Sequence, residues 1–316
     1  MNLRRLFTAV AIAAASAVAT HAQTTPLGPI VLVLPASPRT LALGDVGVTS
    51  RDDDVLFFNP AQLAVATGYS ASVERFSSNV ALTSLSAVTR FNGGGIGLGM
   101  RMANYYLPGA ATTLPAAPTT IPGLFESGTT PATSVELSAG LAQVIKGWRV
   151  GAAGELAEDQ DVGNRFARGL LDVGVSKQVF GSYTVGASVQ NIGQDFEEEI
   201  VATELNTGRR ESVNLPRMAT LGISRGGPVG EFDLFGTAAV SWNRDNSLYP
   251  AGGLEVNYSW LSGYNIALRA GGRRPLPGEE AFTAGAGFTM DRLSIDYALE
   301  TLSGGRIGNR LGLRIR

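Results

Sequence analysis

The fold is decided by two consecutive stretches, Phe282-Thr-Ala-Gly-Ala-Gly-Phe-Thr-Met290 and Leu293-Ser-Ile-Asp-Tyr-Ala-Leu-Glu300. In both stretches apolar side chains alternate with small or polar side chains. A repeat of two residues is the repeat of a β-strand, so each stretch presents one apolar face and one polar face. Only Asp291 and Arg292 separate the two stretches, and so short a connection predicts an antiparallel hairpin.

The same alternation returns along the chain after Gly68. Such segments number 14, and we expect strands at residues 70–77, 79–90, 95–102, 134–145, 148–157, 167–178, 183–192, 216–225, 231–243, 251–260, 264–271, 281–290, 292–301 and 306–315. An even number of strands is typical of a membrane barrel formed by one bacterial chain. The connections are alternately short and mostly long, which is typical of periplasmic turns and outer loops, and this places both chain ends in the periplasm.

Two all-β architectures compete for this pattern, a soluble sandwich or barrel and a transmembrane barrel. In a soluble β-protein the exposed face should carry many Lys, Glu and Thr side chains. Here the non-apolar face is rich in Gly, Ala and Ser, and the chain has 40 glycines. Small residues with a few opposite charges suit a crowded polar lumen. We therefore expect these charged side chains to face the lumen and to form arginine–carboxylate pairs: Arg101, Glu136, Arg149, Glu155, Asp172, Glu255, Arg269, Asp296, Glu300, Arg310 and Arg314.

Residues 1–22 have the features of a secretory signal peptide. Arg4 and Arg5 precede an apolar run from Leu6 to Ala19, and Thr20-His21-Ala22 ends in a small residue that suits cleavage. No run of 18 apolar residues follows, so strands are the remaining way for the mature chain to cross a bilayer.

The chemistry of the mature chain is restricted, because His21 is the single histidine and there is no cysteine. Imidazole-based triads, cysteine nucleophiles and zinc sites with imidazole or thiolate ligands all need side chains that this chain lacks. We predict a protein that is not an enzyme and that has no cofactor or metal centre. The formal net charge of −2 indicates no nucleic-acid partner.

The residues between the signal and the first strand, 23–69, are expected to form a lead-in and a hatch, and residues 70–316 the barrel. Strict alternation is absent from the hatch, and its capping residues predict short helices. Asn59 followed by Pro60 has the pattern of an N-cap with proline at the first helical position, and this structural role is favoured over ligand contact.

Other hatch residues leave more than one role open. Asp52, Asp53 and Asp54 could bind calcium, but consecutive residues rarely converge on one ion, and a solvated acidic helix start is favoured. Phe57 and Phe58 could close the lumen or touch an apolar substrate, and packing inside the hatch explains them equally well.

An ordered set of motifs resembles a known family. Leu41-Ala-Leu-Gly-Asp-Val-Gly-Val48, Asp52-Asp-Asp54 and Phe58-Asn-Pro-Ala-Gln-Leu-Ala64 are similar to the amino-terminal signature of the PorV/PorQ family, and Val189-Gln-Asn-Ile-Gly193 and Leu268-Arg-Ala-Gly-Gly272 add further matches. That family belongs to the wider FadL-like outer-membrane barrels. The resemblance covers nearly all of the mature chain, and it implies a 14-stranded barrel with an amino-terminal hatch, embedded in outer-membrane lipid.

Two functions of different class follow from the resemblance. A PorV-like protein would be a non-enzymatic barrel of the type IX secretion pathway, whose partners are secreted cargo proteins and surface-attachment components. A FadL-like protein would be a passive conduit that takes hydrophobic small molecules across the outer membrane. The family match favours the first. A lumen packed shut by arginine–carboxylate pairs would count against the second.

Overall fold

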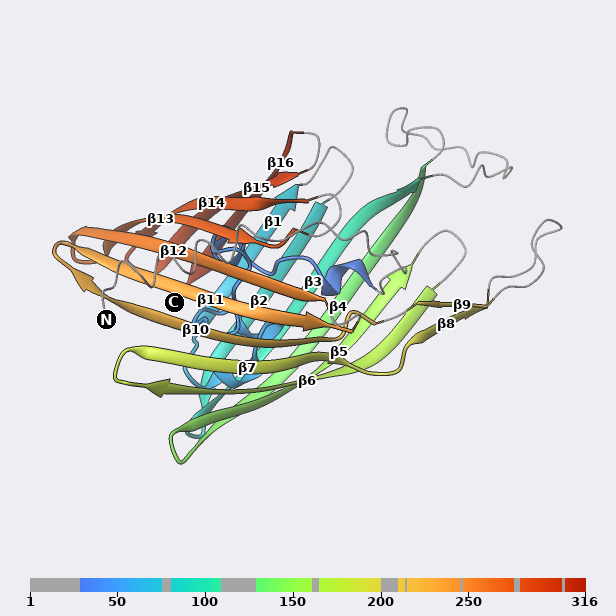
Figure 1. Ribbon diagram of the computed structural model, residues 1–316, viewed down its shortest axis with the longest axis horizontal. Coiled ribbons are helices and arrows are strands. Elements are labelled where there is room, and N and C mark those ends of the chain that lie inside the picture. Colours follow the sequence, from blue (N-terminus) through green and yellow to red (C-terminus); the bar gives the residue numbers. More distant parts are fainter. Residues whose placement is uncertain are drawn as a thin grey trace.

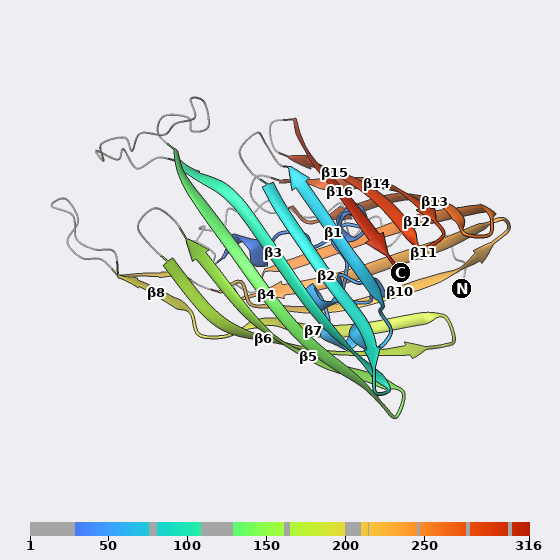
Figure 2. The same cartoon turned by 180° about the vertical axis from the view of Figure 1, so that it is seen from behind.

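A computed structural model of the protein describes residues 29–75, 81–108, 129–160, 165–199, 210–213, 215–244, 247–275, 279–302 and 305–316. Within these residues, 14 antiparallel strands close into one barrel in the order β1-β16-β15-β14-β13-β12-β11-β10-β7-β6-β5-β4-β3-β2 (Figures 1 and 2). Every neighbour in the barrel is also a neighbour in the chain, apart from the step from β7 to β10 and the closure of β1 on β16. The expected fold class, a closed 14-stranded β-barrel, is confirmed.

Each of the segments expected from the alternation corresponds to one barrel strand. The first seven are β1 (Gly68–Arg75), β2 (Ala81–Phe91), β3 (Gly94–Pro108), β4 (Thr129–Ile145), β5 (Trp148–Gln160), β6 (Arg165–Val179) and β7 (Tyr183–Ile192). The other seven are β10 (Met218–Val229), β11 (Phe232–Asn243), β12 (Leu248–Leu261), β13 (Tyr264–Arg273), β14 (Glu279–Met290), β15 (Leu293–Leu302) and β16 (Arg306–Ile315).

Two features of the strands differ from the expectation. β3 and β4 are longer, because backbone pairing continues to Pro108 and Thr129 although the side-chain alternation has already ended. The connection from β7 to β10 contains an additional two-stranded sheet of β8 (Phe196–Glu199) and β9 (Arg210–Val213), which a run of glutamates hides from a search for alternation. Figure 1 shows this ribbon projecting beyond one end of the barrel.

Alternation along strands such as β16 separates an outer apolar surface from a polar interior. On β16, Gly308, Arg310, Gly312 and Arg314 are buried inside while Leu311 and Leu313 between them are about half exposed on the outside. The same division holds on β5, where Arg149 and Glu155 face inward. An apolar outer surface with a polar interior is typical of barrels that span a membrane.

Three of the short connections are tight hairpin turns. Asn92-Gly93, Lys146-Gly147 and Phe180-Gly181 all have positive φ at both residues. Such pairs form the turns whose twist matches that of antiparallel strands. The backbone therefore reverses within two or three residues at these positions, as the sequence predicts.

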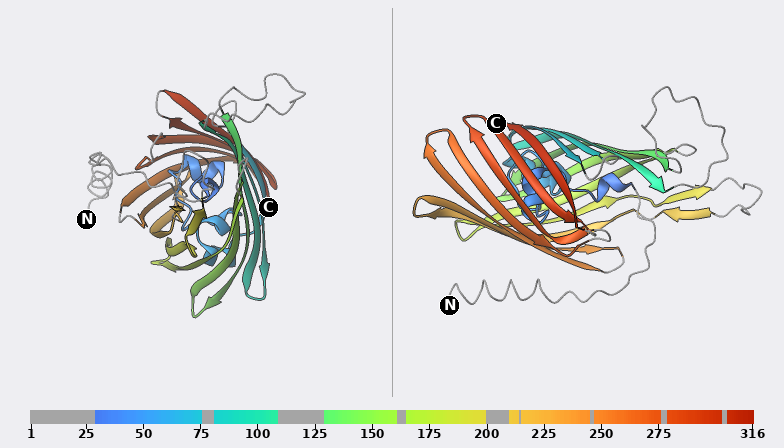
Figure 3. Two further views of the ribbon diagram at one scale, coloured as in Figure 1. Left: turned by 90° about the vertical axis from the view of Figure 1, so that its right-hand side faces the viewer. Right: turned by 90° about the horizontal axis from the view of Figure 1, so that it is seen from above.

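The described residues before β1, 29–67, lie inside the barrel, where Figure 3 shows the short helices enclosed by the strands. These helices are η1 (Ile30–Leu32), α2 (Pro38–Ala42), η2 (Val55–Phe57) and η3 (Pro60–Ala64). η3 packs against β2 to β6, and α2 packs against β13 to β16, so the hatch crosses the lumen from one arc of the wall to the other. In the described part of the chain, no helix is long and apolar enough to cross a membrane.

Inward-facing glycines leave room for the hatch. A Cβ atom at Gly95 would lie 1.9 Å from the carbonyl oxygen of Leu63, and one at Gly174 would lie 1.9 Å from Oδ1 of Asn59. Any larger side chain at these positions would overlap the hatch backbone or its capping residue. The high glycine content thus reflects, in part, the close packing of a folded segment against the inside of the wall.

Candidate functional site

A packed cluster of buried apolar side chains interrupts the polar lining of the lumen, and we call it the apolar chamber although hatch side chains fill it. Five wall residues form it, and they come from β2, β3, β5, β6 and the residues just before β10: Leu82, Ala103, Ala157, Leu170 and Leu215. Val31 and Leu32 of η1 fill the chamber, with Ile30 and Leu34 packed beside them. The backbone N–H of Val31 also donates to Oγ of Ser134 at 3.3 Å. The hatch therefore packs against apolar side chains that the wall provides.

Two wall arginines hold the backbone that follows the chamber. Arg101 donates from Nη1 to the carbonyl oxygen of Leu34 at 2.8 Å, and from Nε to Oε2 of Glu136 at 2.7 Å. Arg310 is fully buried and donates to the carbonyl oxygens of Pro35 and Ala36, in the second case at 2.8 Å.

Arg310 also reaches Glu74 on β1, with Nη1 2.8 Å from Oε2, and the hydroxyls of Ser72 and Ser84. A guanidinium has five N–H donors, and each group that it meets here is an acceptor. Together Arg101 and Arg310 bind three successive carbonyls of the hatch.

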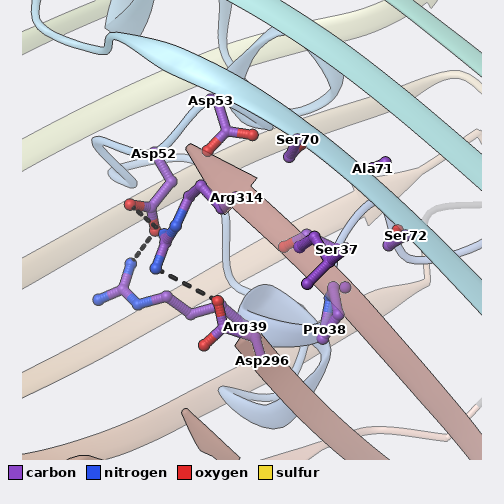
Figure 4. Close-up of a pocket in the computed structure, with 12 residues that line it drawn as sticks. Ser37, Pro38, Arg39, Asp52, Asp53, Ser70, Ala71, Ser72, Asp296 and Arg314 are labelled. Carbon is purple, nitrogen blue, oxygen red and sulfur yellow. Dashed lines mark hydrogen bonds and ion pairs between the residues drawn. The ribbon is translucent and has the colours of Figure 1, made fainter. Parts of the chain in front are cut away.

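A closed ring of six alternating charges lies on another arc of the wall. We call it the charge ring, and its members in order are Arg39, Asp52, Arg314, Asp296, Arg269 and Glu255. Arg39 and Asp52 belong to the hatch, and the other four project from β16, β15, β13 and β12. Figure 4 shows Arg39, Asp52, Arg314 and Asp296 joined around this part of the lumen.

The contacts of the charge ring are close. Arg39 binds Glu255 through Nε at 2.8 Å and Nη2 at 3.0 Å, and Arg269 reaches the same carboxylate at 2.5 Å. Arg314 lies 2.6 Å from Asp52 and 3.2 Å from Asp296. Beside the ring is a cavity of about 20 Å³, room for one water molecule.

Asp52, Asp53 and Asp54 are buried, with 4%, 1% and 2% of their surface exposed, so the expectation of a solvated helix start is wrong. Burial alone would raise the pKa of Asp52, but Arg314, Arg39 and Arg316 hold it well below its usual range. Burial and the neighbouring carboxylates raise the pKa of Asp54 to about 7, and Ser37 donates to it at 2.5 Å. These acids can be buried because arginine side chains and hydroxyl groups of the same chain bind their carboxyl groups.

The other hatch candidates have packing roles. Asn59 caps η3, since its Oδ1 accepts from the N–H of Ala61 at 3.0 Å and Pro60 occupies the first helical position. The guanidinium of Arg101 lies over the aromatic ring of Phe57, with Cζ of Arg101 4.8 Å from the centre of the ring. Phe58 packs over Gly47 within the hatch.

The remaining lumen candidates are all buried but do not meet at one point. Arg149 donates to Gln62 of η3 at 3.1 Å. Asp172 accepts from the N–H of Asn191 at 2.7 Å, and Glu155 lies on the strand beside it. Over the residues that the structure describes, no group of three or more acidic or histidine side chains is arranged to hold a metal ion.

Sequence reasoning missed Arg39, Glu74 and the chamber residues. Glu74 could have been found, because Ser70, Ser72 and Glu74 alternate with Ala71 and Val73 on the expected first strand. Arg39 carries no such signal, because its ion-pair partner Glu255 is 216 residues away.

The chain resembles solved structures of hydrocarbon channels in its fold. The match with the toluene transporter TodX of Pseudomonas putida covers 88% of this chain and 96% of that one, with a TM-score of 0.59 and 11% sequence identity. The match with the monoaromatic hydrocarbon channel CymD covers 92% of this chain and 98% of that one, with a TM-score of 0.61 and 11% identity. The match with the toluene transporter TbuX of Ralstonia pickettii covers 89% of this chain and 98% of that one, with a TM-score of 0.53 and 11% identity. No family model and no curated protein matches the sequence. At this identity the likeness shows the fold alone.

Proposed function

We propose that the protein is an outer-membrane conduit for small hydrophobic molecules, with the apolar chamber as its binding site and the hatch as its gate. The observation that carries the proposal is the chamber itself, a cluster of apolar wall side chains in a polar lumen against which Val31 and Leu32 of the hatch pack. The fold that the chain shares with three hydrocarbon channels supports the same class of cargo. A small aromatic hydrocarbon is the chemical class that would suit the chamber.

The ion pairs of the lumen limit how such a conduit works. Arg101, Arg310 and the charge ring tie the hatch to the wall inside the lumen, and this arginine–carboxylate packing counts against a conduit that is always open. A permanently open pore is therefore not proposed. Entry of a ligand requires Val31 and Leu32 to leave the chamber, at a cost of roughly 1.5–3 kcal/mol of lost burial for each side chain, which burial of the ligand must offset.

The PorV-like secretion function is not proposed here, because none of the three solved neighbours is a secretion barrel. The longest connection between the expected strands, 103–133, lies largely outside the described residues, and the expected signal peptide 1–22 lies wholly outside them. Export by that signal, insertion in outer-membrane lipid and the resemblance to the PorV/PorQ family remain predictions. The conduit needs no reactive side chain, in keeping with a protein that is not an enzyme.

Uptake of a radiolabelled monoaromatic hydrocarbon tests the proposal in cells of a Gram-negative host. Cells that make the protein should take up the compound faster than cells that lack it. The double variant Val31→Ala/Leu32→Ala empties part of the chamber and should increase the rate. Leu41→Ala removes a buried hatch side chain outside the chamber and serves as the matched control. Equal uptake with and without the protein would refute the conduit.

A further inference from the structure

The charge ring joins the hatch to the barrel wall through ion pairs. Arg39 and Asp52 flank the middle of the hatch, whereas Glu255, Arg269, Asp296 and Arg314 belong to four wall strands. The side chains of all six are at most 15% exposed. A buried charge is costly unless a partner of opposite sign lies against it. The ring therefore requires the hatch to be docked.

Asp52 is the member on which most positive charge converges. Arg39 from the hatch, Arg314 from β16 and Arg316 just after β16 all bind its carboxylate. Without that negative charge, Arg39 and Arg314 would face each other as like charges, and in the ring only the contact between Arg39 and Glu255 would still attract the hatch to the wall. The wall members would still pair with each other, since Arg269 bridges Glu255 and Asp296, and Arg314 reaches Asp296.

We propose that the charge ring is a latch that keeps the hatch docked, and that Asp52 is its release point. The wall half of the ring is a self-paired chain of four charges that persists with or without the hatch. The hatch half, Arg39 and Asp52, completes the ring or leaves it as a unit. The latch concerns only the docking of the hatch, so it does not depend on what the barrel transports.

Hydrogen exchange by mass spectrometry on the full-length barrel in lipid nanodiscs tests the latch. Asp52→Asn should speed exchange of hatch amides in residues 38–66 by at least about 10-fold, while the strands β12 to β16 keep their protection. Arg39→Gln should act in the same direction, and it keeps the test open if the first variant fails to insert. Arg244→Gln, which removes an ion pair with Asp195 outside the lumen, is the matched control and should change nothing in the hatch.

The double variant Arg39→Gln/Asp52→Asn separates a latch from general destabilisation. Each single change leaves five charges with an imbalance of one, whereas the double change removes one charge of each sign and leaves the self-paired wall. Its effect should therefore be smaller than the product of the two single fold-changes. Independent effects, equal loss of protection in hatch and strands, or unchanged hatch exchange in both single variants would each overturn the proposal.

Discussion

Replacing Arg310 by methionine should be among the most damaging single changes in the barrel. Its side chain is fully buried and pairs with Glu74, which is also fully buried. Removing one member of a buried ion pair typically costs about 3–5 kcal/mol, because the other charge is left without its partner. The carbonyls of Pro35 and Ala36 lose their donors as well, at about 1–3 kcal/mol for each one that stays unsatisfied. We expect Arg310→Met to lower the free energy of unfolding by at least about 4 kcal/mol.

A second variant divides this loss between its two causes. Arg310→Met/Glu74→Leu removes both charges, and an apolar replacement of a whole ion pair is often neutral. The double variant should recover about 3 kcal/mol relative to Arg310→Met and keep the loss that comes from the two carbonyls. Leu311→Met, a change on the outer face of the same strand, should stay within about 0.5 kcal/mol of the wild type.

Urea unfolding in phospholipid vesicles, followed by tryptophan fluorescence, measures these differences. Trp148, Trp242 and Trp260 lie on strands of the wall and report the barrel itself. A double variant no more stable than Arg310→Met would show that the stranded charge is not the main cost. A loss below about 1 kcal/mol in Arg310→Met would show that Arg310 does not tie the hatch to the wall.

Three further predictions use the same unfolding assay. The pKa of Asp54 is raised from 3.8 to about 7, so the contribution of its protonation to the free energy of unfolding is fully present below pH 3.8 and is lost as the pH rises through 7. Asp54→Asn should flatten this decline of stability with pH, and an unchanged pH profile would contradict the prediction. Gly174→Ala should cost about 1–3 kcal/mol because its Cβ would overlap Asn59, whereas Gly154→Ala, with open space around it, should be nearly neutral. Asn59→Ala should cost about 1–2 kcal/mol through loss of the η3 cap, and equal stability would exclude that role.

The strands could be predicted from the sequence because each strand carries its own pattern. The inward face of β16 is defined by Arg310, Gly312 and Arg314 alternating with Leu311 and Leu313, whatever the rest of the chain does. The additional β8–β9 ribbon was missed because its residues do not alternate, and β3 and β4 are extended by pairing rather than by pattern.

The hatch could be located but not explained from the sequence. Asp52 resembles a solvated residue in any local window, and its burial depends on partners such as Arg316, 264 residues away. The sequence contains one local signal of the chamber. Leu170 and Leu171 are adjacent on a strand and point to opposite faces, so one of them must face the lumen. Only the closed barrel shows that Leu170 meets Leu82 and Leu215 there.

Reversible locking of the hatch in the chamber tests the central claim most directly. Because the N–H of Val31 lies 3.3 Å from Oγ of Ser134, Val31→Cys/Ser134→Cys introduces two thiols at neighbouring hatch and wall positions of a protein that has no other cysteine, and mass spectrometry verifies that oxidation joins them. Hydrocarbon uptake should stop when this pair is oxidised and return when it is reduced, while Val31→Cys alone should not respond to the oxidant. Uptake that continues at the same rate through the locked barrel would contradict a gate formed by the hatch.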